Sequence, residues 1–171
     1  LHRHFRRQRQ MCIRDRMSDA PKELCELVLK RGGKLEGDRL IYPPNLIENT
    51  IAKHQRVVLL AGQTIENDLH VGGNHVYAGT GGAAPNLQNS KTNEYVPSKL
   101  KDLYNAARLA DRLPHISFFS RSLVAGDVED PLEFDLSTAA ASLAGTSKHV
   151  MVQASHWSHV VAIAELCYKI A

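Results

Sequence analysis

The first third of the chain alternates short apolar segments with turn residues. Apolar residues recur at helical spacing over 21–31, and Gly32-Gly33 is typical of a helix end. A polar, glycine-containing turn within residues 35–42 predicts a β-hairpin. Residues 46–54 are then expected to form a helix, and residues 57–60 a short apolar strand.

Two more short strands are expected around a second glycine-rich turn. Residues 69–71 and 75–77 flank Gly72-Gly73-Asn74, a composition that favours a tight hairpin. Residues 17–96 are therefore predicted to form an α+β arm built from successive hairpins.

Helical periodicity returns after this arm. Pro97-Ser98 predicts a helix start with Ser98 as the N-cap, and Pro114 predicts its end. The expected buried stripe of this helix consists of Leu100, Leu103, Tyr104, Ala107 and Ala110.

Strands and helices alternate in the remainder of the chain. We predict a strand at 115–119, a helix at 134–144, a strand at 149–152 and a helix after Ser155-His156. This alternation is typical of βαβ units with parallel strands. Only two βα units are visible, whereas an eight-stranded α/β barrel needs about 250 residues. The alternatives are a small α/β domain and the opening of a barrel. We favour an α/β fold in which residues 97–171 are the first βα units of a truncated TIM-type (β/α)8 barrel.

Composition narrows the class of protein. Hydrophobic residues make up 43% and charged residues 23% of 171 residues, which is typical of a globular chain. No apolar run approaches the roughly 20 residues of a membrane helix, so no membrane association is expected. Cys12, Cys25 and Cys167 are too few and too far apart for a disulfide framework, so we expect a cytoplasmic protein.

The net charge of +3 comes from the first sixteen residues, which hold six arginines and one aspartate. The remainder has 15 basic and 17 acidic residues, so no nucleic-acid partner is expected.

Within the basic stretch, residues 11–16 resemble a translated sequencing-library adapter. We interpret residues 1–16 as foreign, with a basic binding arm or a transit peptide as the alternatives. The apolar helix pattern after Ser158 has no capping signal, so we also expect the chain to be an N-terminal fragment.

The segment Gly79-Thr80-Gly81-Gly82 is the most distinctive candidate for chemistry. Glycines let backbone N–H groups approach an anion or a flat cofactor closely. The segment lacks the Lys-Ser/Thr of a phosphate P-loop and the long helix of a dinucleotide fold. The alternative is a tight, buried turn that joins hairpins.

Ligands of parallel α/β sheets gather at the carboxyl ends of the strands. This rule singles out Ser120 and Arg121 after the first strand and Gln153 after the second. Arg121 could bind a carboxylate through both arms of its guanidinium group. The alternative is a loop salt bridge to one of three acids, namely Asp127, Glu129 or Asp130.

Three histidines, His149, His156 and His159, lie in or near the second strand. His149 is expected to be a packed structural residue. His156 and His159 have the spacing of a metal-binding pair, but the sequence offers no third ligand nearby, so no metal is expected.

The order of motifs after residue 69 resembles that of the trimethylamine methyltransferase family. The matching segments are HVGGNHVYAGTGGAAP at 70–85, ARLAD at 107–111, the strand ending in Phe118-Phe119, DLSTA at 135–139 and TSKHVM at 146–151.

The resemblance implies an α/β barrel that transfers a methyl group from a methylated amine to the cob(I)alamin of a partner corrinoid protein. The amine would be trimethylamine or a quaternary amine such as glycine betaine, with Arg121 and Gln153 as substrate-binding candidates and 79–82 as the cofactor-binding candidate. Some family members carry pyrrolysine at a position well beyond residue 171, so the catalytic residues are expected outside this chain, which would then be inactive alone. Tyr77, Phe118 and Phe119 could face an ammonium group, although strand aromatics are more often core.

Two other functions stay open at this point. The chain could open a different barrel enzyme, of lyase or aldolase type, that uses 79–82 as an anion site. It could also be a non-catalytic assembly fragment that self-associates through an unfinished sheet edge. A homo-oligomer is compatible with each of these.

Overall fold

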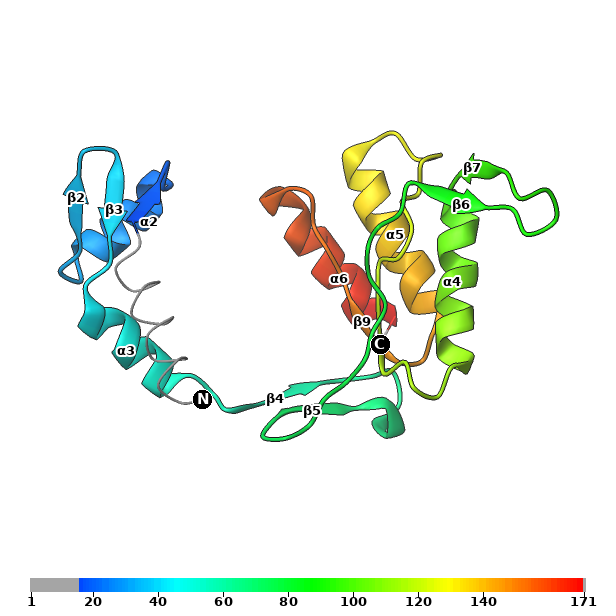
Figure 1. Cartoon of the computed structure of the whole chain (residues 1–171), viewed down its shortest axis with the longest axis horizontal. Helices are drawn as coiled ribbons and strands as arrows, with labels where there is room; N and C mark the ends of the chain where they lie inside the picture. Colours follow the sequence, from blue (N-terminus) through cyan, green and yellow to red (C-terminus); the bar gives the residue numbers. More distant parts are fainter. Residues whose placement is uncertain (1–15, 171) are drawn as a thin grey trace. The chain divides into compact units, whose positions relative to one another are not determined.

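The computed structural model describes residues 16–170, and its contacts divide the chain into two compact units at Gln55–Arg56 (Figure 1). The stretch 1–15, for which an adapter origin is predicted, lies outside the described residues. The predicted division at 96/97 stays a prediction.

The first unit is a three-stranded antiparallel sheet with two helices. Its strands β1 (Arg16–Ser18), β2 (Lys34–Glu36) and β3 (Arg39–Ile41) lie in the order β1-β3-β2. Its helices are α2 (Lys22–Leu29) and α3 (Pro44–Lys53). The predicted hairpin and both helices are confirmed.

The second unit begins with an antiparallel hairpin of β4 (Val57–Leu60) and β5 (Leu69–Gly72), joined through a 3-10 turn at Ile65–Asn67. The prediction that 69–71 pairs with 75–77 is wrong. The amide of His75 donates to the Gly72 carbonyl in a turn, and Val76 is 93% exposed. Pairing with β4 instead matches Leu60 with Leu69, so two apolar side chains meet.

A second hairpin, of β6 (Asn86–Gln88) and β7 (Tyr95–Pro97), leads into α4 (Leu100–Arg112). The prediction that Ser98 is the N-cap of α4 is wrong, because Lys99 holds that position. Its buried hydroxyl bonds the carbonyls of Ala84 (3.1 Å) and Val124 (2.7 Å), which fixes the entry to the helix. The Asp102 carboxylate accepts from the Lys99 amide at 3.0 Å and so caps the helix from within its first turn.

The rest of this unit is a βαβ unit with one more helix. It contains β8 (Phe118–Ser120), α5 (Pro131–Gly145), β9 (His149–Met151), a 3-10 turn (Trp157–His159) and α6 (Val160–Ile170). Strands β8 and β9 pair in parallel, as predicted, and α5 packs against both α4 and α6 (Figure 1). The core consists of Leu103, Ala107, Ala110, Phe119 and Leu123.

The fold is therefore mixed α/β, and its closure into an eight-stranded barrel stays a prediction. Among the described residues, no helix is both long and apolar enough to cross a bilayer.

Candidate functional site

The carboxyl ends of β8 and β9 lie side by side, because the strands are parallel with Ser120 opposite Met151. Arg121 directly follows β8, and Gln153 comes two residues after β9. The two predicted substrate-binding residues thus belong to neighbouring strand ends. Gln153 is exposed, whereas Arg121 is partly buried.

The glycine-rich segment runs parallel to β8 rather than turning between hairpins, so the buried-turn interpretation is wrong. Gly79 and Ala84 form bridges with Phe118 and Leu123, respectively. The Thr80 hydroxyl accepts from the Ser120 amide at 2.9 Å and donates to the Ser120 carbonyl at 2.6 Å. The segment therefore extends the sheet beside the strand that carries Arg121.

Packing requires glycine at position 79 of this segment but not at position 81. A Cβ at Gly79 would lie 2.2 Å from the Phe118 ring, so any larger residue would displace that ring. A Cβ at Gly81 would meet nothing within 4 Å. A ligand role for residues 79–82 stays a prediction. The Thr80 hydroxyl is already hydrogen-bonded to the backbone of Ser120 in β8.

The guanidinium group of Arg121 lies 5.3 Å from the centre of the Phe134 ring on α5. Its Nε is buried without a hydrogen-bond partner, and Arg121 forms no ion pair with any carboxylate in residues 16–170. Two of the three loop acids bond backbone amides instead, since Asp127 accepts from the Leu100 amide and Asp130 caps α5 through the Glu133 amide. The alternative of a loop salt bridge is therefore wrong.

Within residues 16–170, two further buried hydroxyl groups lack hydrogen-bond partners. They are Ser122 Oγ, on the next residue, and Thr138 Oγ1, one helical turn after Phe134. An unpaired buried donor costs roughly 1–3 kcal/mol. Arg121 Nε and Ser122 Oγ, directly after β8, are therefore donors that a bound ligand could satisfy.

The three aromatic residues considered for contact with an ammonium group pack or bond within the chain. Phe119 is completely buried in the core, as expected, and Phe118 packs on Gly79. The Tyr77 hydroxyl donates to the His70 carbonyl at 3.4 Å.

A buried network beyond β9 was missed by the sequence analysis. Asp135 of α5, 2% exposed, accepts from the Ser155 amide and hydroxyl at 2.8 Å each and from His159 Nδ1 at 2.7 Å. Burial by itself would raise the pKa of Asp135, but the hydrogen bonds from His159 and Ser155 outweigh it and lower the pKa. The sequence signal was a carboxylate within the largely apolar stretch of α5 that follows Glu133.

The histidines do not assemble a metal site. His159 is bound to Asp135, His156 Nδ1 bonds Ser158 Oγ at 2.7 Å, and His149 Nδ1 bonds the Ala61 carbonyl at 2.7 Å. Within the described part of the chain, no three His, Cys, Asp or Glu side chains gather around a common point.

A second polar cluster lies at the opposite, amino end of β9. Asp111 Oδ1 accepts from the Thr146 hydroxyl at 2.9 Å and from both the amide (2.8 Å) and the hydroxyl (2.9 Å) of Ser147. Lys148 Nζ donates to the Ala110 and Leu113 carbonyls at 2.7 Å each, which caps the end of α4. These contacts give the segments 107–111 and 146–151 a structural role.

A protein-family model for trimethylamine methyltransferases matches residues 17–171. The chain belongs to the trimethylamine methyltransferase family. The match covers both compact units, including the βαβ unit that carries Arg121. A search of curated proteins finds no match. The chain that carries Arg121 and Gln153 thus belongs to a family of methyltransferases.

Proposed function

We propose that the protein containing this chain transfers a methyl group from a methylated amine to the cob(I)alamin of a partner corrinoid protein. The methyl–nitrogen bond breaks, the methyl–cobalt bond forms, and the nitrogen keeps the electron pair as a neutral amine. Family membership supports the reaction class, and the corrinoid is a co-substrate carried by the partner.

The observation that carries the substrate assignment is the unpaired, buried Nε of Arg121 at the carboxyl end of β8. A cationic guanidinium group disfavours a simple ammonium ion, and it attracts a carboxylate. A zwitterion such as glycine betaine carries both a carboxylate and a methylated nitrogen. We therefore favour a quaternary amine with a carboxylate over trimethylamine, with Gln153 as a second polar contact.

The chain's own residues contribute orientation in this proposal. The cation–π contact with the Phe134 ring restrains the Arg121 guanidinium group, so less side-chain freedom is lost when a carboxylate binds. Holding the carboxylate at one end of the substrate directs the methylated nitrogen away from the sheet edge, toward the approaching acceptor.

Turnover is tested with the protein encoded by the uninterrupted reading frame. It is mixed with cob(I)alamin and either glycine betaine or trimethylamine, and the visible spectrum reports methylcobalamin. Methylation from glycine betaine supports the proposal. No methylation by a folded protein with either amine contradicts it and favours another barrel enzyme.

The role of Arg121 is tested by Arg121→Gln in the same assay. We expect KM for glycine betaine to rise by about tenfold or more, since a charge-assisted bond is lost. Arg56→Gln removes the same charge at an exposed position just before β4 and is expected to leave KM unchanged. An unchanged KM in Arg121→Gln would remove this residue from the site.

A further inference from the structure

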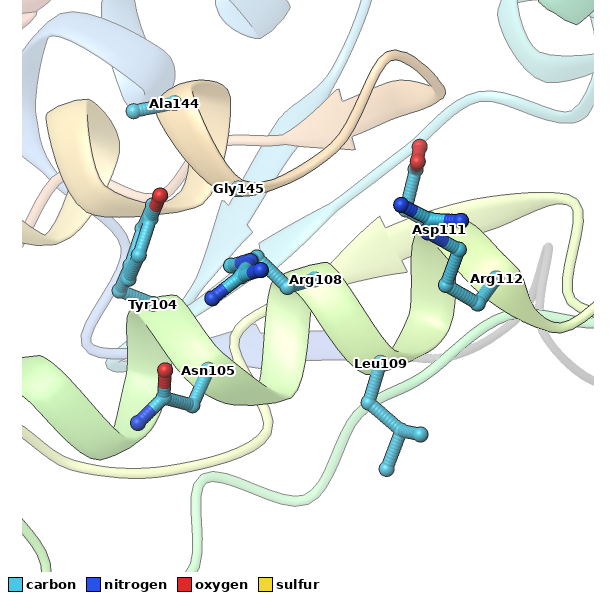
Figure 2. A pocket seen from close by; sticks show the side chains of 8 residues that line it. All are labelled: Tyr104, Asn105, Arg108, Leu109, Asp111, Arg112, Ala144 and Gly145. Carbon is cyan, nitrogen blue, oxygen red and sulfur yellow. The ribbon is translucent and has the colours of Figure 1, made fainter.

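A pocket of about 340 Å³ lies between α4 and α5, near the carboxyl ends of both helices (Figure 2). Because α4 leads to β8 and α5 leads to β9, this pocket lies toward the amino ends of the strands, opposite Arg121. It is lined by Tyr104, Asn105, Arg108, Leu109, Asp111, Arg112, Ala144 and Gly145.

Two arginines dominate the charge of this pocket. Arg108 and Arg112 are one turn apart on α4, and neither forms an ion pair with a carboxylate in residues 16–170. The Arg108 guanidinium group lies 5.8 Å from the centre of the Tyr104 ring, and Figure 2 shows the two side chains next to each other. Arg108 belongs to the segment 107–111, in which Ala107 and Ala110 pack in the core and Asp111 bonds the amino end of β9, whereas Arg108 and Leu109 line the pocket.

One acidic group lines the pocket, and its charge is compensated. Asp111 Oδ1 accepts three hydrogen bonds from Thr146 and Ser147. Burial by itself would raise the pKa of Asp111, but these bonds and the nearby charge of Lys148 outweigh it and lower the pKa. Lys148 also covers two carbonyls at the end of α4. The carboxylate of the lining is therefore hydrogen-bonded, whereas both arginines are exposed and form no ion pair within residues 16–170.

We propose that this pocket binds the phosphate group of a small phosphorylated molecule. Two guanidinium groups one turn apart can each give two parallel N–H bonds to a phosphate, and the Tyr104 hydroxyl and Asn105 amide add neutral donors. The volume is at the lower end of the range for small-molecule sites. The site is separate from the strand ends, so this inference does not depend on the methyl-transfer proposal.

The test is calorimetric titration of the full-length protein that contains this chain with inorganic phosphate, and with succinate as a carboxylate probe, at constant ionic strength. We expect saturable binding of phosphate that Arg108→Gln/Arg112→Gln weakens by about tenfold or more, since two charge-assisted contacts are lost. Lys101→Gln removes one positive charge from the same helix outside the pocket lining and is expected to bind phosphate like the wild type. Thermal melting checks that each variant is folded.

Arg108→Lys gives a second measurement, because it keeps the charge but loses the planar fork. We expect weaker phosphate binding in this variant as well. Absence of saturable phosphate binding by the wild type overturns the proposal, as does equal weakening in Lys101→Gln, which would indicate diffuse charge. Binding of succinate without phosphate overturns the phosphate assignment.

Discussion

At the scale of single residues, two carboxylates, the buried Asp135 and the half-buried Asp111, connect segments that are far apart in the sequence. Asp135 ties α5 to the loop after β9, and Asp111 ties α4 to the start of β9. Each carboxylate replaces its lost hydration with three donated hydrogen bonds on one oxygen. Removing one charge should therefore leave donors on several segments unpaired.

Asp135→Asn is expected to lower the free energy of unfolding by about 2 kcal/mol, because the amide cannot accept charge-assisted bonds from His159 and Ser155. Urea unfolding measures the change. Glu133→Gln on the same helix removes an equal charge from an exposed side chain and should cost less than about 0.5 kcal/mol. Equal effects in the two variants would contradict a special role for Asp135.

The same contacts predict a pH dependence of stability. The pKa of Asp135 is lowered below its ordinary value of 3.8, and so is that of Asp111. A carboxyl group with a lowered pKa in the folded state stabilises the fold fully above its unfolded pKa, and this contribution is lost as the pH falls through the folded pKa. Urea unfolding between neutral pH and pH values below 3.8 should show this loss. Asp135→Asn should show a smaller decrease than the wild type, and an identical decrease would contradict the assignment.

At the scale of elements, the close approach of α4 and α5 depends on a missing side chain. A Cβ at Gly145 would lie 2.5 Å from the Cβ of Ala107 and 2.9 Å from the Tyr104 carbonyl oxygen. Two small residues thus let the helices meet beside the pocket that contains Arg108.

Gly145→Ala should destabilise the second unit by about 1–3 kcal/mol, because the added methyl group forces α4 and α5 apart. Thermal or urea unfolding measures this. Gly81→Ala is the matched control, since its Cβ meets nothing within 4 Å, and should change stability by less than about 0.5 kcal/mol. A Gly145→Ala variant as stable as the control would mean that the helices shift without cost.

The lysine that caps α4 gives a second prediction at this scale. Lys148→Met keeps most of the side-chain volume but leaves the Ala110 and Leu113 carbonyls without a donor. We expect a loss of about 2 kcal/mol in the free energy of unfolding. Lys169→Met, near the end of α6, serves as the comparison, and similar losses in both would argue against capping.

At the scale of the whole molecule, the chain consists of two compact units that divide at Gln55–Arg56. The residues around this division, 53–56, are exposed. Exposed chain between compact units is where proteases cut first.

Limited trypsin treatment should therefore cleave at Lys53 or Arg56 before it cleaves inside α4. Lys101, Arg108 and Arg112 of α4 are equally exposed and act as internal controls, since the helix is packed against α5. Mass spectrometry identifies the order of cuts after residue 16. First cleavage within α4 would contradict the division into these two units.

Local patterns in the sequence predicted most elements of the fold. Helical periodicity and flanking glycine or proline gave α2, α4 and α5, and the alternation of strands with helices gave the parallel pair β8–β9. Strand partners were harder to predict, because 69–71 is close to 75–77 in sequence but pairs with β4. Pairing depends on which apolar faces can be buried together, and this is a property of the folded chain.

For the candidate site, the strand-end rule identified Arg121 and Gln153 but could not supply their partners. The sequence also allowed a salt bridge between Arg121 and one of three acids, because these acids follow it by only six to nine residues. In the structure Asp127 and Asp130 accept instead from amides in the first turns of α4 and α5.

The sequence by itself thus determined the classes of element, their order and the family, since these depend on local periodicity and on a linear series of motifs. The tertiary structure alone decided which polar groups are paired. It joined Asp135 to His159 and Asp111 to Ser147, and it left Arg121 Nε buried without a partner. The physical reason is that hydrogen bonds and ion pairs form only between groups within about 3–4 Å of each other, and folding brings such groups together from distant positions in the chain.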